Sequence, residues 1–115
     1  DGSPIRDFIH SRDVALGMLH MVDNKVNVPV NLGSGEGIAI KQIVDIVVEK
    51  CPRDIEVEWD TTKPAGDKRR ILDSTRAESV GFKTSISLED GIQETIEWFE
   101  KNRSTIDDRH NAFTK

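Results

Sequence analysis

Three segments of this chain carry apolar residues at helical spacing, and they leave few choices for its fold. Apolar positions recur every three or four residues along 11–23, 40–50 and 88–99, a period that places them on one face of a helix. A short helix is expected after Asp73, ending at Gly81, because glycine is favoured just past a helix end. Four helices in 115 residues leave room for only a few short strands. The pattern predicts a small α/β fold.

The ends of the long helices and the strands between them also have sequence signals. Ser11 is predicted to cap the first helix, and Ser87 begins a capping box that opens the last one. Extended segments are expected at residues 5–10, 26–32, 55–59 and 70–72, which alternate apolar with polar residues or are rich in β-branched residues. After the opening segment, the expected order is helix, strand, helix, strand, strand, helix, helix.

Charge and composition argue against several classes of protein. The chain has 21 acidic against 16 basic residues, whereas general nucleic-acid binding requires a broad basic face. No apolar run approaches the roughly 18 residues that span a bilayer, so no membrane partner is expected. Cys51 is the single cysteine, which permits no internal disulfide and favours the cytoplasm. His10, His20 and His110 are too far apart for a helical metal pair, and we expect no metal site.

The most unusual stretch chemically is residues 63–73, KPAGDKRRILD. A Pro-x-Gly turn here delivers three consecutive cations into a short apolar run. Clustered Lys and Arg attract anions, and Arg can bind phosphate oxygens through two hydrogen bonds. The alternative is a solvated charge run beside a strand. Arg6, far away in the sequence, favours a phosphate site, although it could instead pair with Asp7 or Asp13.

A glycine-rich turn at residues 33–37, GSGEG, lies between an expected strand and a helix, where dinucleotide loops occur. The spacing differs from G-x-G-x-x-G, because the third glycine would fall at Ile38. A tight structural turn is therefore the preferred interpretation. No acid–base pair and no serine-hydrolase elbow stands out. From its residues alone, the chain has phosphate-binding groups and no reaction centre.

Several of these segments resemble one enzyme family. Residues 2–10, GSPIRDFIH, resemble the G-x-x-x-R-D-[FY]-[IL]-H segment of the NAD(P)-dependent sugar-nucleotide epimerase/dehydratase family, the extended branch of the short-chain dehydrogenases. NLGSG at 31–35 is similar to the strand and turn that follow there. Residues 63–73 resemble K-P-D-G-x-x-[RK]-K-L-L-D, most typical of the GDP-L-fucose synthase branch, and ISLEDGIQETIEWF at 86–99 matches the closing helix. The resemblance covers nearly all of residues 1–103.

This resemblance implies that residues 1–103 are the small C-terminal, substrate-binding portion of an extended short-chain dehydrogenase, without its Rossmann half, and that 104–115 are a polar tail. It implies that Arg6, Arg69 and Arg70 bind the nucleotide sugar. Ala65 replaces a substrate-contacting aspartate of the family, which leaves the exact sugar nucleotide open, and Ala39 replaces a frequent capping Ser or Thr at a cost of about 1 kcal/mol.

The resemblance places the cofactor loop and the Y-x-x-x-K catalytic pair in an N-terminal part, and this chain has no tyrosine. We therefore expect no catalytic or cofactor-binding residue in the chain, and NADP or NAD in the parent enzyme. The expected partners are a nucleotide sugar, the missing Rossmann portion and, in the parent, a second copy in a homodimer. An isolated fragment should expose apolar surface, be marginally stable or self-associate, and fail to bind NADP(H) tightly.

Three functions remain open at this stage. The first is a fragment, inactive alone, of a GDP-L-fucose synthase-like enzyme that converts GDP-4-keto-6-deoxymannose to GDP-L-fucose. The second is a fragment of a sugar-nucleotide 4-epimerase or 4,6-dehydratase. The third is a non-catalytic module that binds sugar nucleotides.

Overall fold

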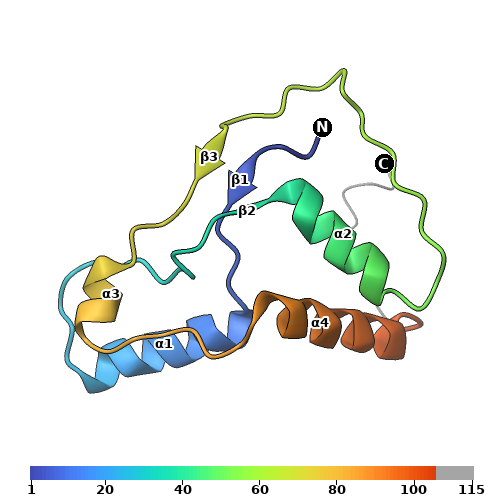
Figure 1. Cartoon of the computed structure of the whole chain (residues 1–115). Coiled ribbons are helices and arrows are strands. Elements are labelled where there is room, and N and C mark those ends of the chain that lie inside the picture. Colours follow the sequence, from blue (N-terminus) through green and yellow to red (C-terminus); the bar gives the residue numbers. More distant parts are fainter. Residues whose placement is uncertain (106–115) are drawn as a thin grey trace.

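The structure is a computed structural model that describes residues 1–105. In this part of the chain, four helices accompany a sheet of three two-residue strands (Figure 1). The elements run in the order β1 (Ile5–Arg6), α1 (Ser11–Asp23), β2 (Ile38–Ala39), α2 (Ile40–Lys50), β3 (Arg69–Arg70), α3 (Thr75–Ser79) and α4 (Leu88–Asn102). The predicted small α/β fold with about four helices is confirmed. Most of the predicted polar tail, residues 106–115, lies outside the described residues.

The sheet has β1 at its centre and joins distant parts of the chain. Its order is β2-β1-β3, with β1 antiparallel to β2 and parallel to β3. Residues 51–68 form the long connection that returns from the end of α2 to β3 (Figure 1). The first residues of the chain also hold the start of α2, because the Ile40 N–H donates to the Pro4 carbonyl at 3.0 Å and the Lys41 N–H to the Gly2 carbonyl at 2.8 Å. These bonds satisfy amides that a helix N-terminus leaves without internal partners.

The caps of the helices partly correct the predictions. His10, and not Ser11, is the N-cap of α1, because its backbone is extended and its Nδ1 accepts from the Arg12 N–H at 3.2 Å. Ser87 caps α4 as predicted, its Oγ accepting from the Asp90 N–H at 3.1 Å. Ala39 caps α2 without a side-chain bond. There the Gln42 Oε1 accepts from the Ala39 N–H at 3.1 Å.

Two predicted strands are wrong: within the described residues, neither 26–32 nor 55–59 forms a strand. A ladder needs a partner for its backbone groups, and no neighbouring strand lies beside either segment in residues 1–105. Pro29 also removes one ladder donor from the first segment. In the second, Trp59 makes the tertiary contact, since a Cβ placed on Gly2 would lie 2.5 Å from its ring. Side-chain packing therefore replaces strand pairing there.

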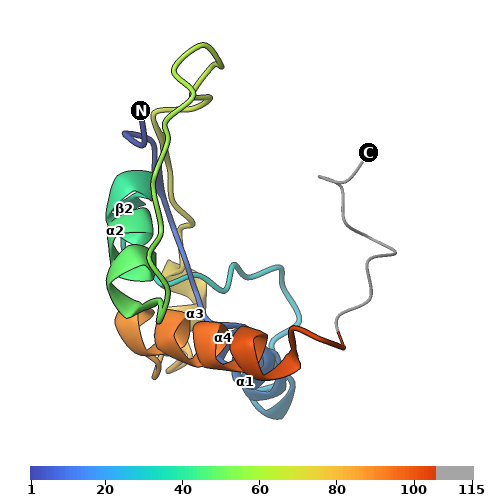
Figure 2. The same ribbon diagram turned by 90° about the vertical axis from the view of Figure 1, so that its right-hand side faces the viewer.

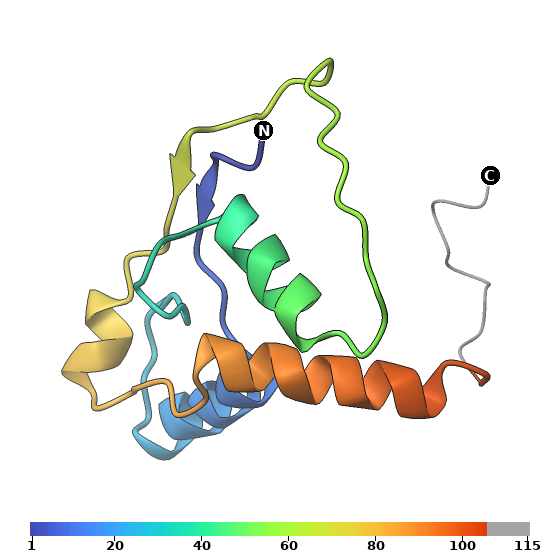
Figure 3. The ribbon, with the colours of Figure 1, turned by 45° about the vertical axis from the view of Figure 1, so that its right-hand side comes forward.

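The buried core is small and lies beside α1 and α3. Met21, Ala77 and Phe82 form it, and the partly buried Ile9, Val26, Val30, Leu32 and Val80 pack against them. Gly17 lets the ring of Phe82 approach α1 closely, because a Cβ at this position would lie 2.7 Å from Phe82 Cε2. The helices α2 and α4 also contact one another and lie next to one another in Figures 1, 2 and 3.

The outer face of α1 is apolar and exposed. We define it by Leu16, Met18, Leu19 and Val22, of which Leu19 is 61% and Val22 is 73% exposed. The opposite side of the helix carries the buried Asp13, Gly17 and Met21. A helix that is apolar around most of its circumference is normally covered on both sides. None of the helices of residues 1–105 combines the length and apolar character that a membrane span requires.

Candidate phosphate-binding site

The pairing of β1 with β3 brings two of the three predicted arginines together. In this parallel pair Arg6 lies opposite Arg70, and Ile5 lies opposite Arg69. Residues at one register position of neighbouring strands project to the same face of a sheet, and successive residues alternate between faces. Arg70 therefore shares a face with Arg6, while Arg69 shares the other face with Ile5. The sequence alone does not show whether Arg69 or Arg70 lies on the same face as Arg6. The alternation of side chains along the strand assigns Arg70 to that face.

Arg6 holds the Pro-x-Gly turn against the sheet. Its Nη1 donates to the Ile5 carbonyl at 2.8 Å and to the Asp67 carbonyl at 2.9 Å. Gly66 has a positive φ of 72° and lies next to the guanidinium, because a Cβ there would be 3.8 Å from Nη2. Within residues 1–105, Arg6 forms no ion pair with a carboxylate. The guanidinium thus retains N–H groups for an anion.

The neighbouring carboxylates that were alternative partners of Arg6 bind other groups. The Asp7 Oδ1 accepts from the Ser34 N–H at 2.9 Å and from the Ser34 hydroxyl at 2.5 Å. The Asp7 Oδ2 accepts at 3.3 Å from the N–H groups of both Gly35 and Leu72. Asp7 thereby joins the glycine-rich turn to the residues that follow β3. This role of Asp7 is not apparent from the sequence, because the bonds span 27 and 65 positions of the chain.

Asp13 is buried and anchors the chain between α3 and α4. Its carboxylate is 2% exposed, and it accepts from the Ser85 N–H at 3.1 Å, the Ser85 hydroxyl at 2.6 Å and the Ile86 N–H at 3.0 Å. Burial raises the pKa of Asp13, but the hydrogen bonds from Ser85 and Ile86, together with the nearby His10, lower it by a larger amount. The pKa of Asp13 therefore lies below its ordinary value. This carboxylate is therefore held in its charged form, and its role is to fix the position of α1.

His10 lies at the junction of α1 and α4. Its Nδ1 accepts the Arg12 N–H, and its Nε2 lies 3.8 Å from Glu94 Oε2, while Arg12 pairs with the other oxygen of Glu94. Both ring nitrogens of His10 thus face other groups of the chain. Among residues 1–105, no three His, Cys, Asp or Glu side chains form a cluster that could hold a metal ion.

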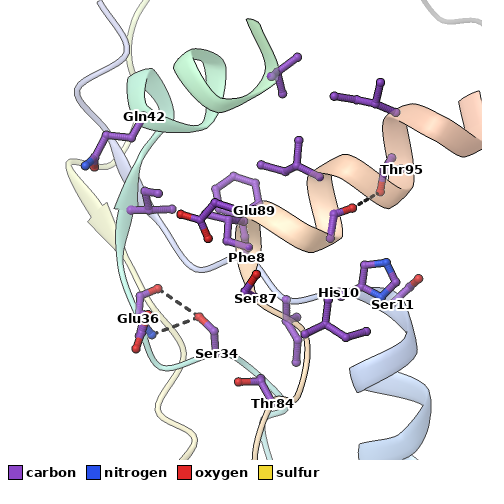
Figure 4. Close-up of a pocket in the computed structure, with 18 of the residues that line it drawn as sticks. Phe8, His10, Ser11, Ser34, Glu36, Gln42, Thr84, Ser87, Glu89 and Thr95 are labelled. Atoms are coloured by element: carbon purple, nitrogen blue, oxygen red, sulfur yellow. Dashed lines mark hydrogen bonds between the residues drawn. The ribbon is translucent and has the colours of Figure 1, made fainter. Parts of the chain in front are cut away.

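A cavity of about 1050 Å³ opens between α2, α4 and the segment that joins β1 to α1 (Figure 4). Apolar side chains of the two helices line one part of it, among them Val47, Ile92, Ile96 and Phe99. At the other end, the Ser34 hydroxyl accepts from the Glu36 N–H at 3.1 Å (Figure 4). None of Arg6, Arg69 and Arg70 lines this cavity. The cationic pair and the cavity are therefore separate features of the surface.

The chain is similar in sequence to several sugar-nucleotide synthases and epimerases. No protein-family model matches the chain. GDP-L-fucose synthase 1 of Arabidopsis thaliana is 35% identical over 102 residues, which are 88% of this chain and 32% of that protein. A putative UDP-glucose 4-epimerase of Methanocaldococcus jannaschii is 33% identical over 105 residues, which are 91% of this chain and 34% of that protein.

Solved structures have the same fold over most of the described residues. A GDP-L-fucose synthetase of Naegleria fowleri bound to NADP matches 91% of this chain and 34% of its own with a TM-score of 0.83 at 23% identity. A UDP-glucose 4-epimerase of Thermotoga maritima with UDP-glucose matches 90% of this chain and 34% of its own with a TM-score of 0.75 at 27% identity. The resemblance to the NAD(P)-dependent sugar-nucleotide epimerase/dehydratase family is confirmed.

The match to this family is partial in length. The chain spans about a third of the curated relatives that it matches, and it corresponds to their C-terminal part. The glycine-rich turn at 33–37 does not fit the dinucleotide-binding role known for glycine loops, because the N–H groups of Ser34 and Gly35 already donate to Asp7. Amides that bind a carboxylate of the chain are not available to a cofactor phosphate. Two amides of this turn are therefore bound within the chain, to Asp7.

Proposed function

We propose that this chain is the sugar-nucleotide-binding part of an NAD(P)-dependent epimerase/reductase of the GDP-L-fucose synthase type, and that Arg6 and Arg70 bind the diphosphate of the substrate. The observation that carries the proposal is the β1–β3 register, which sets Arg6 opposite Arg70 across 64 positions of sequence. Two arginines at one register position, on the same face of the sheet, suit a diphosphate, which offers several charged oxygens. In the parent enzyme the reaction would be the conversion of GDP-4-keto-6-deoxymannose to GDP-L-fucose.

The exposed outer face of α1 supports the proposal that the chain functions with a further segment. Leu16, Met18, Leu19 and Val22 form a continuous apolar surface on one helix, and apolar surfaces of this kind mark interfaces. We propose that the Rossmann part of the parent enzyme covers this face and brings NADP or NAD and the catalytic tyrosine and lysine. A homodimer in the cytoplasm is the proposed state of the parent. In this arrangement the chain alone is inactive and does not bind NADP(H) tightly.

A second candidate within the same family is a 4-epimerase or 4,6-dehydratase. The 33% identity to a putative UDP-glucose 4-epimerase favours it, as does Ala65, which removes a polar substrate contact implied by the resemblance to GDP-L-fucose synthase. A non-catalytic sugar-nucleotide-binding module would use the same arginine pair. The three candidates differ in the preferred base of the nucleotide and in whether an N-terminal part restores turnover.

Titration of the full chain with GDP and with UDP by isothermal calorimetry tests the binding proposal. Arg6→Ala and Arg70→Ala should each weaken GDP binding about tenfold or more, because a hydrogen bond to a charged group contributes about 1.5–3 kcal/mol. Arg69→Ala should have a smaller effect, since its side chain projects from the opposite face. Lys101→Ala, on exposed α4, is the control and should bind normally.

Two results would contradict the proposal. One is GDP affinity that is unchanged in both Arg6→Ala and Arg70→Ala. The other is turnover of a GDP-4-keto sugar by the purified chain without any further segment, because no tyrosine is present to transfer the proton. Stronger binding of UDP than of GDP would favour the 4-epimerase candidate instead.

A further inference from the structure

Asp7 connects three parts of the chain through one carboxylate. Both oxygens are occupied by backbone donors: Oδ1 by the Ser34 N–H at 2.9 Å, and Oδ2 by the N–H groups of Gly35 and Leu72 at 3.3 Å. The Ser34 hydroxyl adds a fourth bond at 2.5 Å. A carboxylate that accepts several backbone amides is strongly held, since hydrogen bonds to charged groups are about twice as strong as neutral ones.

The position of these bonds matters because the strands are so short. β1 and β3 each contain two residues, and the Ile5 N–H, which donates to the Lys68 carbonyl at 2.9 Å, is one of the bonds that join them. Such a short pair is marginal without support from outside the ladder. Asp7 directly follows β1, and Leu72 lies two residues beyond β3. The Asp7–Leu72 bond thus extends the contact between the two strands past the end of their ladder.

The glycine-rich turn completes this arrangement. A Cβ placed on Gly33 would lie 2.6 Å from Asp7 Oδ2 and 3.0 Å from the Cβ of Leu72. Glycine is therefore needed at position 33 for the carboxylate to reach between the turn and the β3 side of the sheet. Ser34 and Gly35 then direct their amides at the carboxylate and fix its orientation.

We infer that Asp7 is a positioning residue that holds β3 in register with β1 and so keeps Arg70 beside Arg6. Its importance for ligand binding rests on the proposed function of this arginine pair. Asp7 itself has its oxygens turned to backbone donors, so it supports the anion site through the geometry of the two strands and not by binding the anion. Arg6 and Asp7 are adjacent in sequence, but they have different roles.

The charge of Asp7 makes it possible to predict whether its removal raises or lowers the affinity for a diphosphate. Asp7 carries a negative charge next in sequence to Arg6, and a like charge near an anion opposes its binding. Removing that charge would by itself strengthen the binding of a diphosphate. If Asp7 positions the strands, removing it must weaken binding instead. The two explanations therefore predict opposite changes in affinity.

Asp7→Asn in the full chain is the decisive variant. Because both carboxylate oxygens accept N–H groups, the amide nitrogen of asparagine must face a backbone donor in either orientation. Asp60→Asn is the matched control, since it removes the same charge from a carboxylate whose bonds are local, to the N–H and hydroxyl of Thr62. Gly33→Ala is the second variant, which displaces the carboxylate without changing any charge.

Two measurements are made on each folded variant: calorimetric affinity for GDP, and NMR hydrogen exchange of the Ile5 and Leu72 amides without ligand. We expect Asp7→Asn and Gly33→Ala to weaken GDP binding at least fivefold and to speed exchange at both amides at least tenfold, while Asp60→Asn changes neither in that direction. If Asp7→Asn fails to fold, Ser34→Ala, which removes only a hydroxyl donor, should still speed exchange at Leu72.

Unchanged exchange at Ile5 and Leu72 in folded Asp7→Asn would overturn the inference, and so would GDP affinity that rises as the charge argument alone requires. Failure of the proposed function has a different signature. If the wild-type chain does not bind GDP, or Arg6→Ala binds it normally, the arginine pair is not a diphosphate site. The exchange rates then still decide whether Asp7 holds β3 in register with β1.

Discussion

The buried carboxylate of Asp13 offers the sharpest test of how the chain is held together. It is 2% exposed and accepts three hydrogen bonds, from the Ser85 N–H, the Ser85 hydroxyl and the Ile86 N–H. These bonds span more than 70 positions and attach α1 to the segment that leads into α4. We compare Asp13→Ala, which removes every acceptor, with Asp13→Asn, which keeps the shape of the side chain.

The magnitude follows from the geometry. Asp13→Ala removes the acceptor of all three bonds, and each bond to a charged acceptor contributes about 1.5–3 kcal/mol, so we expect a loss of at least about 4 kcal/mol in the free energy of unfolding. In Asp13→Asn the amide oxygen can take both N–H groups on Oδ2, and the amide nitrogen can donate to the Ser85 hydroxyl. Only the charge is lost, and we expect a decrease of about 2 kcal/mol.

Urea unfolding followed by circular dichroism and by tryptophan fluorescence measures both losses, with Asp23→Asn at the exposed end of α1 as the control. Native domains have about 5–15 kcal/mol of stability, so Asp13→Ala should shift the midpoint strongly or prevent folding. Equal losses in Asp13→Ala and Asp13→Asn would refute the reasoning, because they would show that the hydrogen-bond geometry does not matter. A loss below about 1 kcal/mol in Asp13→Ala would refute it as well.

Three further predictions concern pH, capping and association. Because the pKa of Asp13 is lowered on folding, its contribution to the free energy of unfolding is complete above about pH 4 and is lost as pH falls through its folded pKa. Urea midpoints measured below about pH 4 should therefore fall less steeply with pH in Asp13→Asn than in the wild type. Parallel pH profiles of the two proteins would contradict this. Ala39→Ser should raise the unfolding free energy by about 1 kcal/mol, since a serine Oγ can accept the Gln42 N–H while Gln42 keeps its bond to the N-cap amide; a lowered melting temperature would disprove the gain. The chain should self-associate through the outer face of α1. The double variant Leu19→Lys, Val22→Lys should therefore have a lower molecular mass than the wild type by light scattering at high protein concentration. A wild-type chain that is monomeric at every concentration would argue against an interface on this face.

The sequence by itself determined the helices, because their signals are local. Apolar spacing, the Ser87 cap and the glycine at position 81 each act within a few residues, and α1, α2 and α4 have the ranges that these signals predict to within three residues. The motifs also indicated the resemblance to the sugar-nucleotide epimerase/dehydratase family, since they occur in the right order along the chain. Arg6 and the 63–73 stretch were found in the same way, as cations in unusual local settings.

Only the tertiary structure decided the strands and the positioning of the site. Residues 26–32 and 55–59 have the composition of strands, yet in residues 1–105 they find no partner for their backbone groups. β1 and β3, by contrast, pair across more than 60 positions, and that register separates Arg70 from Arg69. The carboxylates of Asp7 and Asp13 select their donors at similar distances in sequence. The pairing of a strand and the hydrogen bonds of a buried carboxylate both depend on the residues that lie beside them in space. Those residues are distant in sequence, so local sequence patterns do not identify them.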